Sequence, residues 1–154
     1  MCVRAVRKVM AVASGGGHWV ELRRIMPAFE GTEVVYVCTY PRADADLAPA
    51  RYYPVRNVTR KNGPAFAVTI RQILAIVRRE RPDVVVTTGA APGLIALALA
   101  KLVCGSRTVW IDTVASSEHM SLSGRLARPV ADAWLVQWPH LAKAGGPEFW
   151  GAVL

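Results

Sequence analysis

Runs of β-branched and other apolar residues alternate along the chain with segments that have helical spacing. The runs predict strands over 9–13, 33–39, 83–88, 108–112 and 133–137, the last strand, with a shorter one near 52–55. The helical spacing predicts helices over 18–29, 64–81 and 123–130, and from the turn 89–93 to about 103. We expect Val20 on the buried face of the first helix, and Phe66 and Val68 on that of the second.

This alternation of strands and helices is typical of parallel strands joined by right-handed crossovers. Because the strands are continuously apolar, both faces of the sheet should be covered. The sequence therefore predicts a single α/β domain over 1–154, a Rossmann-like three-layer arrangement around a mostly parallel sheet. In such sheets ligands bind at the carboxyl ends of the strands, so the loops 14–18, 39–44, 88–93 and 112–123 should share one rim.

Charge narrows the range of partners. The 154 residues are 53% hydrophobic and carry 19 Lys and Arg against 11 Asp and Glu, a formal net charge of +8. This balance favours an anionic partner, such as nucleic acid, a phosphorylated substrate or an acidic membrane surface. The chain lacks the aromatic stripe of RNA-binding modules, so we expect no nucleic acid. The apolar runs are too short to span a bilayer, so membrane contact should be peripheral.

The first predicted loop consists of Ser14, Gly15, Gly16 and Gly17, and it is followed by His18. Glycines allow close backbone approach, and a helix start offers unpaired N–H groups to phosphate. The spacing matches neither GxGxxG nor a Walker A motif, and a tight turn without a ligand is the alternative interpretation. At a helix start His18 would favour its neutral form and could accept a proton from a hydroxyl, although a capping or packing role explains it equally well.

A second loop repeats this pattern. Thr88, Gly89, Ala90 and Gly93 clear space at another helix start and make a candidate phosphate or acceptor site, or simply a tight turn.

In the loop 112–123, Asp112 could accept hydrogen bonds from sugar hydroxyls, and Ser121, Ser123 and Arg125 could bind phosphate. Ser123 as the N-cap of the following helix is the structural alternative. The spacing of Asp112, Glu118 and His119 matches no known ligand pattern, so we expect no metal.

The segment after 136 is polar and aromatic and includes Gln137, Trp138 and Trp150. Such a composition favours a protein interface, although a core position explains Trp138 almost as well.

Several of these segments together resemble a known family. Ser14-Gly15-Gly16-Gly17-His18, then 87–93 (TTGAAPG), 121–126 (SLSGRL) and 136–138 (VQW) occur in the same order in accessory subunits of bipartite glycosyltransferases. One branch of that family recruits the eukaryotic N-acetylglucosamine transferase chain to dolichol-diphosphate sugar. The other branch comprises bacterial proteins of capsule and exopolysaccharide synthesis. The resemblance runs from about residue 9 to 154.

The resemblance implies half of a GT-B fold, the acceptor-side domain. A separate catalytic subunit would bind the nucleotide-sugar, so no cofactor is expected on this chain. The acceptor would be a lipid-diphosphate-linked sugar at the inner face of the membrane, reached from the cytoplasm. A similar loop ending in His in a single-chain peptidoglycan relative makes His18 a candidate base. Eukaryotic members carry an N-terminal membrane helix, whereas here attraction to lipid would come from basic residues, namely Arg4, Arg7, Lys8, Arg56, Arg60 and Lys61.

A stand-alone nucleotide-binding enzyme, such as a reductase, is the alternative from another class. It requires an acidic residue after the second strand and a complete glycine fingerprint. Here the residues after the second strand are Thr39, Tyr40 and Pro41, none of which is acidic. The first helix contains no further glycine that would complete the fingerprint.

Overall fold

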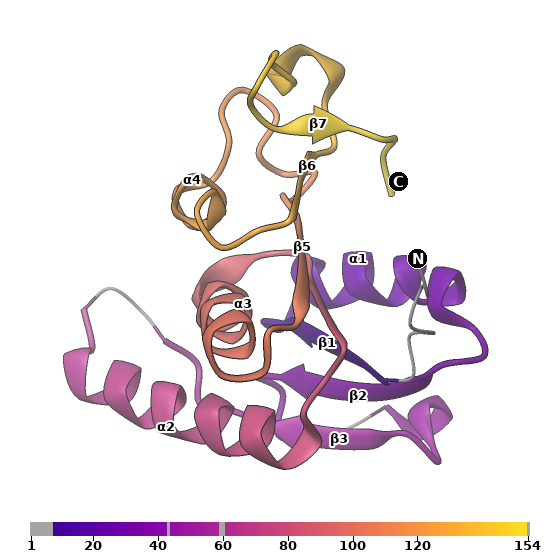
Figure 1. The fold of residues 1–154 in the computed structure, drawn as a ribbon, viewed down its shortest axis with the longest axis vertical. Helices are drawn as coiled ribbons and strands as arrows, with labels where there is room; N and C mark the ends of the chain where they lie inside the picture. Colours follow the sequence, from indigo (N-terminus) through magenta and orange to yellow (C-terminus); the bar gives the residue numbers. More distant parts are fainter. Residues whose placement is uncertain (1–7, 43, 59–60, 154) are drawn as a thin grey trace.

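A computed structural model describes residues 8–42, 44–58 and 61–153 of the chain (Figure 1). Its centre is a seven-stranded sheet of order β3-β2-β1-β4-β5-β6-β7 in which all neighbouring strands run parallel. The strands are β1 (Lys8–Ala13), β2 (Glu33–Cys38), β3 (Arg51–Pro54), β4 (Val84–Thr87), β5 (Arg107–Ile111), β6 (Ala133–Val136) and β7 (Glu148–Phe149). The predicted α/β class is confirmed.

Helices cover both faces of the sheet, as the apolar strands predict. One layer contains α2 (Gly63–Glu80), α3 (Ala90–Cys104) and α4 (Leu122–Ala127), and the opposite face carries α1 (Gly17–Ile25) and the 3-10 helix η1 (Met26–Phe29) (Figure 1). Two short 3-10 helices, η2 (Ala45–Leu47) and η3 (Pro139–Leu141), lie in the connections. The two faces of the sheet bury separate apolar clusters, one around Trp110 and Ile73 and the other around Trp19 and Leu22.

The first helix is shorter than predicted, and one residue expected on its buried face points outward. It ends at Ile25, and the chain continues as η1, because Pro27 has no N–H to extend the α-helical ladder. Trp19 and Leu22 are buried, whereas Val20 is 49% exposed. The prediction for Val20 is therefore wrong, since consecutive helical residues point about 100° apart.

Helix α2 shows the same kind of correction. Its buried face is a stripe of residues three and four apart, namely Ala65, Thr69, Ile73, Ile76, Val77 and Glu80. Phe66 and Val68 lie outside this stripe and are 42% and 38% exposed, so the prediction of a core role for them is wrong.

Three boundaries also differ from the prediction. A further strand, β7, pairs with β6 at the sheet edge, although 133–137 was predicted to be the last strand. Its two residues are too few to show a periodic pattern. Ser121 caps α4 by accepting a hydrogen bond from the Gly124 N–H (2.9 Å), so Ser123 is not the N-cap. Helix α3 begins at Ala90, which places Gly93 inside its first turn.

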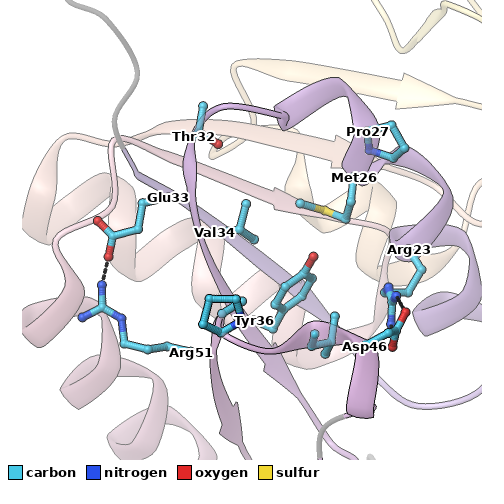
Figure 2. Close-up of a pocket in the computed structure, with 12 residues that line it drawn as sticks. Arg23, Met26, Pro27, Thr32, Glu33, Val34, Tyr36, Asp46 and Arg51 are labelled. Atoms are coloured by element: carbon cyan, nitrogen blue, oxygen red, sulfur yellow. Dashed lines mark hydrogen bonds and ion pairs between the residues drawn. The ribbon is translucent and has the colours of Figure 1, made fainter.

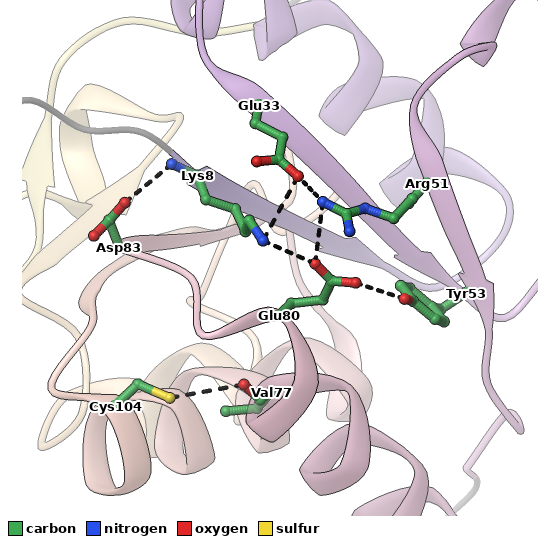
Figure 3. Close-up of polar contacts among 8 residues, drawn as sticks. All are labelled: Lys8, Glu33, Arg51, Tyr53, Val77, Glu80, Asp83 and Cys104. Carbon is green, nitrogen blue, oxygen red and sulfur yellow. Dashed lines mark hydrogen bonds and ion pairs between the residues drawn. The ribbon is translucent and has the colours of Figure 1, made fainter.

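A network of charged side chains ties α2 to the amino ends of the first three strands (Figure 3). The buried Glu80 carboxylate accepts hydrogen bonds from the Lys8 ammonium (3.1 Å) and the Tyr53 hydroxyl (2.5 Å). Arg51 pairs with Glu80 and with Glu33. Lys8 is therefore occupied inside the fold, which corrects its prediction as a free lipid-binding charge.

Within the described part of the chain, no helix combines the length and the apolar character needed to cross a bilayer.

Candidate functional site

The four predicted loops meet at the carboxyl edge of the sheet. The Gly15 N–H donates to the Thr39 hydroxyl (2.8 Å), which joins the first loop to the second. His18 contacts Thr88 of the third loop, and the Thr113 hydroxyl of the fourth donates to Glu21 of α1 (2.8 Å). Hydrogen bonds therefore connect the first loop and α1 to every other loop of the rim.

Thr88 holds His18 at two points. The His18 Nδ1 lies 2.9 Å from the Thr88 carbonyl oxygen, and the Thr88 hydroxyl donates to the His18 carbonyl oxygen (2.6 Å). Because a carbonyl oxygen only accepts, Nδ1 must carry the proton in this contact. The neutral ring then has its lone pair on Nε2, the arrangement that a general base requires.

Gly89 allows the imidazole to sit this close. A Cβ at Gly89 would lie 2.7 Å from the His18 Cε1, and the glycine has φ of 131°, which side-chain-bearing residues rarely adopt. The next residue, Ala90, has φ of 67° and is not a glycine. Such a conformation costs about 1–3 kcal/mol and is concentrated at functional sites. The backbone strain therefore lies directly beside His18.

Two residues that were not among the predicted site residues, Thr39 and Tyr40, close the glycine-rich loop. The Thr39 hydroxyl accepts from Gly15, and the Tyr40 hydroxyl accepts from the Gly16 N–H (2.6 Å). The Tyr40 ring lies against Gly15, where a Cβ would come within 2.5 Å of it. Their place directly after β2, on the predicted rim, was the signal that could have identified them.

The N–H groups at the start of α1 remain available to an anion. Gly16 is the N-cap, and neither the Gly17 N–H nor the His18 N–H has a hydrogen-bond partner among the described residues. Gly16 and Gly17 are exposed, and Ser14 is half-buried at the end of β1. Two unpaired amides at a helix N-terminus bind phosphate oxygens well.

The side chain of Asp112 holds the loop before α4 in place through hydrogen bonds. Its buried carboxylate accepts from the Ser121 N–H (2.8 Å), the Ser121 hydroxyl (2.5 Å) and the Trp110 indole N–H (3.2 Å). The expectation that Asp112 contacts a sugar is therefore corrected, because the residue is 1% exposed and its carboxylate is already bonded. Ser123 is half-buried and Arg125 is exposed.

The predicted interface residues differ in exposure. Gln137 is 3% exposed, so the structure corrects its assignment as a direct partner contact. The half-buried Trp138 donates to the Val114 carbonyl oxygen (2.7 Å). Trp150 is 69% exposed and donates to the Glu148 carboxylate (2.8 Å), which leaves most of its ring at the surface.

Other features lie away from this rim. A cavity of about 740 Å³ opens between η1, β2 and η2, beside Met26, Tyr36 and Asp46 (Figure 2). None of the predicted site residues lines it. Gly93, inside α3, packs against the Thr87 side chain. Within the described ranges, no three His, Cys, Asp or Glu side chains are grouped as metal ligands would be.

Solved structures share this fold. Acinetobacter baumannii MurG superposes with a TM-score of 0.72 at 15% identity over 93% of this chain, and the match spans 45% of MurG. A UDP-N-acetylglucosamine 2-epimerase from Rickettsia bellii superposes with a TM-score of 0.64 at 14% identity over 88% of this chain and 40% of that one. The chain therefore spans less than half the length of these two neighbours.

Sequence comparison identifies the family. The family model described as "Oligosaccharide biosynthesis protein Alg14 like" matches residues 51–153. The "UDP-N-acetylglucosamine transferase subunit ALG14" of Eremothecium gossypii is 32% identical over 169 residues, covering 89% of this chain and 75% of the relative. Its namesake from Yarrowia lipolytica is 30% identical over 144 residues, covering 89% of this chain and 62% of that protein. This chain belongs to the Alg14-like family of oligosaccharide biosynthesis proteins.

Proposed function

We propose that this chain is the acceptor-side subunit of a two-component glycosyltransferase. It would bind a lipid-diphosphate-linked sugar at the membrane and dock a separate catalytic subunit that carries the nucleotide-sugar. Two observations support this proposal. The relatives are named as subunits of a UDP-N-acetylglucosamine transferase, and the chain corresponds in fold to 45% of a MurG chain.

The geometry of His18 carries the chemical part of the proposal. The Nδ1–H of His18 is held by the Thr88 carbonyl oxygen at 2.9 Å, so Nε2 is free to accept a proton. An acceptor hydroxyl oxygen would attack the anomeric carbon of the donor sugar while Nε2 takes its proton. The bond from that carbon to the nucleoside diphosphate breaks, and the diphosphate leaves with the bonding electron pair. The partner subunit would hold this leaving group.

The acceptor diphosphate would lie at the start of α1. The unpaired N–H groups of Gly17 and His18 are adjacent there, and the second of them belongs to the same residue as the base. A diphosphate anchored at these amides would place the attached sugar near the imidazole.

The layer of helices α2 to α4 supplies an attraction to anionic lipid. The exposed basic residues within the three helices are Arg71, Arg78, Arg79 and Arg125, while the only acidic residue within them is the buried Glu80. Leu126 and Leu102 are 55% and 81% exposed on the same helices. Such a mixture of exposed cations and aliphatic side chains suits peripheral binding to an anionic membrane.

The predicted lipid-binding residues contribute in part. Arg56 and Lys61 are exposed near the start of α2, and Arg4, Arg7 and Arg60 lie outside the described residues. On this proposal the chain works from the cytoplasm at the inner face of the membrane.

Docking of the catalytic subunit would use the exposed aromatic surface after β6. Trp150 offers the largest exposed aromatic area there. Trp138 lies just after the end of β6. Exposed tryptophans of this kind are common anchors of protein interfaces.

Reconstitution tests the proposal. Radiolabelled UDP-GlcNAc and a lipid-diphosphate-linked GlcNAc acceptor are incubated with this chain, with the donor-side subunit, and with both. We expect transfer only when both chains are present, and no calorimetric binding of UDP-GlcNAc to this chain alone. Transfer by this chain without a partner, or tight UDP-GlcNAc binding to it, would overturn the proposal.

A further inference from the structure

A buried polar cluster next to the rim has no part in the proposed chemistry. Glu21 is 5% exposed and Gln137 is 3% exposed. Their side chains meet at 2.8 Å, where the Gln137 amide donates to the Glu21 carboxylate, although the two residues are 116 positions apart. No ion pair of the described residues includes Glu21, so neutral donors alone compensate this carboxylate.

Each oxygen of Glu21 has its own donor. The Thr113 hydroxyl donates to one oxygen (2.8 Å), and the Gln137 amide donates to the other. Glu21 lies one helical turn after His18 on α1, so these two hydrogen bonds fix the same short helix that presents the imidazole. A buried carboxylate is costly without its hydrogen bonds, which makes the position of α1 sensitive to both donors.

Gln137 extends the contact to the segment 150–153. Its amide oxygen accepts from the Val153 N–H (2.8 Å), and its amide nitrogen also donates to the Asp112 carbonyl oxygen (2.9 Å). Arg24 of α1 donates to the Val153 carbonyl oxygen (3.2 Å). Helix α1 therefore binds the Val153 carbonyl directly and is linked to the Val153 N–H through Gln137.

Apolar side chains of α1 and of the sheet also lie around this segment. The segment 150–153 lines a cavity of about 280 Å³ together with Ile25 of α1 and with Ile111 and Leu135 of the sheet. The side chain of Trp150 faces the surface at 69% exposure, so a partner can contact the segment there.

We infer that Glu21 and Gln137 are positioning residues that couple the segment 150–153 to His18. A partner subunit that holds Trp150 would fix Val153, and through Gln137 and Glu21 it would hold α1 with the imidazole against Thr88. The inference rests on the proposed function in treating His18 as the base. It adds that partner binding and the orientation of that base are linked.

The test follows the His18 imidazole in the isolated chain by ¹H–¹⁵N spectroscopy, which distinguishes the Nδ1–H from the Nε2–H tautomer. Val153→Pro removes the N–H that Gln137 accepts, while the matched control Val153→Ala keeps it. We expect Val153→Pro to lower the ratio of Nδ1–H to Nε2–H tautomer by roughly two- to tenfold, which corresponds to the net value of one hydrogen bond. Val153→Ala should leave that ratio unchanged.

Glu21→Gln tests the centre of the bridge, because an N–H₂ donor replaces one of the two acceptor oxygens of Glu21. It should produce the same change in the His18 tautomer ratio with the Val153 N–H intact. An unchanged ratio in Val153→Pro would overturn the inference even if Glu21→Gln failed to fold. This readout does not involve sugar transfer, so it can fail while the proposed function stands, and the proposed function can fail while the coupling is observed.

Discussion

The imidazole of His18 and the backbone carbonyl of Thr88 are 2.9 Å apart, although 70 residues separate them in the chain. The Thr88 hydroxyl returns a hydrogen bond to the His18 carbonyl oxygen at 2.6 Å. This reciprocal pair joins the start of α1 to the loop before α3, and it fixes which ring nitrogen carries the proton. The proposed chemistry depends on this orientation.

Replacing Thr88 by Val removes the hydroxyl that holds the His18 backbone while keeping the side-chain shape. The free energy of unfolding should fall by about 1–2 kcal/mol, because the buried hydrogen bond is lost. Urea denaturation measures this change. Thr88→Ser, which retains the hydroxyl, should recover most of the lost stability, and equal destabilisation by the two variants would argue against a role for that hydrogen bond.

Tyr40→Phe should expose the Gly16 N–H, which now donates to the Tyr40 hydroxyl at 2.6 Å. We expect a third amide to become available beside those of Gly17 and His18, so inorganic diphosphate should bind several-fold more tightly, by about 1 kcal/mol. Calorimetric titration of the isolated chain measures this affinity. Tyr53→Phe removes a tyrosine hydroxyl at the opposite edge of the sheet and serves as the control. Unchanged affinity in Tyr40→Phe would show that the hydroxyl does not compete with the anion.

Glu80 should make the stability of the fold depend on acid pH. Burial alone raises the pKa of Glu80, but hydrogen bonds from Tyr53 and Lys8, with the nearby charge of Arg51, hold that pKa below its usual range. A carboxyl whose pKa is lower in the folded state stabilises the protein above its unfolded-state pKa. That stabilisation disappears as the pH falls below about 5 and through the folded-state pKa.

Glu80→Gln should therefore lower the free energy of unfolding by about 1–3 kcal/mol at neutral pH and flatten its decline in acid. Unfolding titrations at a series of pH values measure both effects. Glu118→Gln, at an exposed glutamate, should follow the wild type. A Glu80→Gln variant with the wild-type acid dependence would contradict this account.

Vesicle binding should weaken when charge is removed from the outer face of α2. Arg78→Gln with Arg79→Gln removes two exposed cations, each contributing roughly 1 kcal/mol near an anionic surface, so binding should fall about 10- to 30-fold. Cosedimentation with phosphatidylserine-containing vesicles measures the change. The matched control, Arg42→Gln with Lys143→Gln, removes two exposed charges outside the helical layer. An equal loss in both pairs would indicate a general charge effect rather than an oriented surface.

Much of the fold could be predicted because the strands are buried on both faces. Runs such as 84–87 are apolar throughout, so they are visible without knowledge of their neighbours. The sequence specifies the buried faces of the helices less clearly. In α1 the sequence does not distinguish Val20 from Trp19, because both are large and apolar and only packing selects the buried one.

The rim could be predicted, but its internal contacts could not. The topological rule brings the loops of His18, Thr88 and Asp112 to one edge. It does not reveal that Asp112 turns inward to Ser121, because that depends on side-chain orientation. The contact of Glu21 with Gln137 joins residues 116 positions apart and leaves no local pattern.

The transfer rate of the reconstituted pair with His18→Asn tests the central claim most directly. The asparagine amide can still donate to the Thr88 carbonyl oxygen but has no basic nitrogen, so the fold should persist without the base. We predict that kcat falls by about 10²- to 10⁴-fold, while affinity for the donor-side subunit is unchanged. Transfer at the wild-type rate by the His18→Asn pair would contradict the assignment of His18 as the base of an acceptor-side subunit.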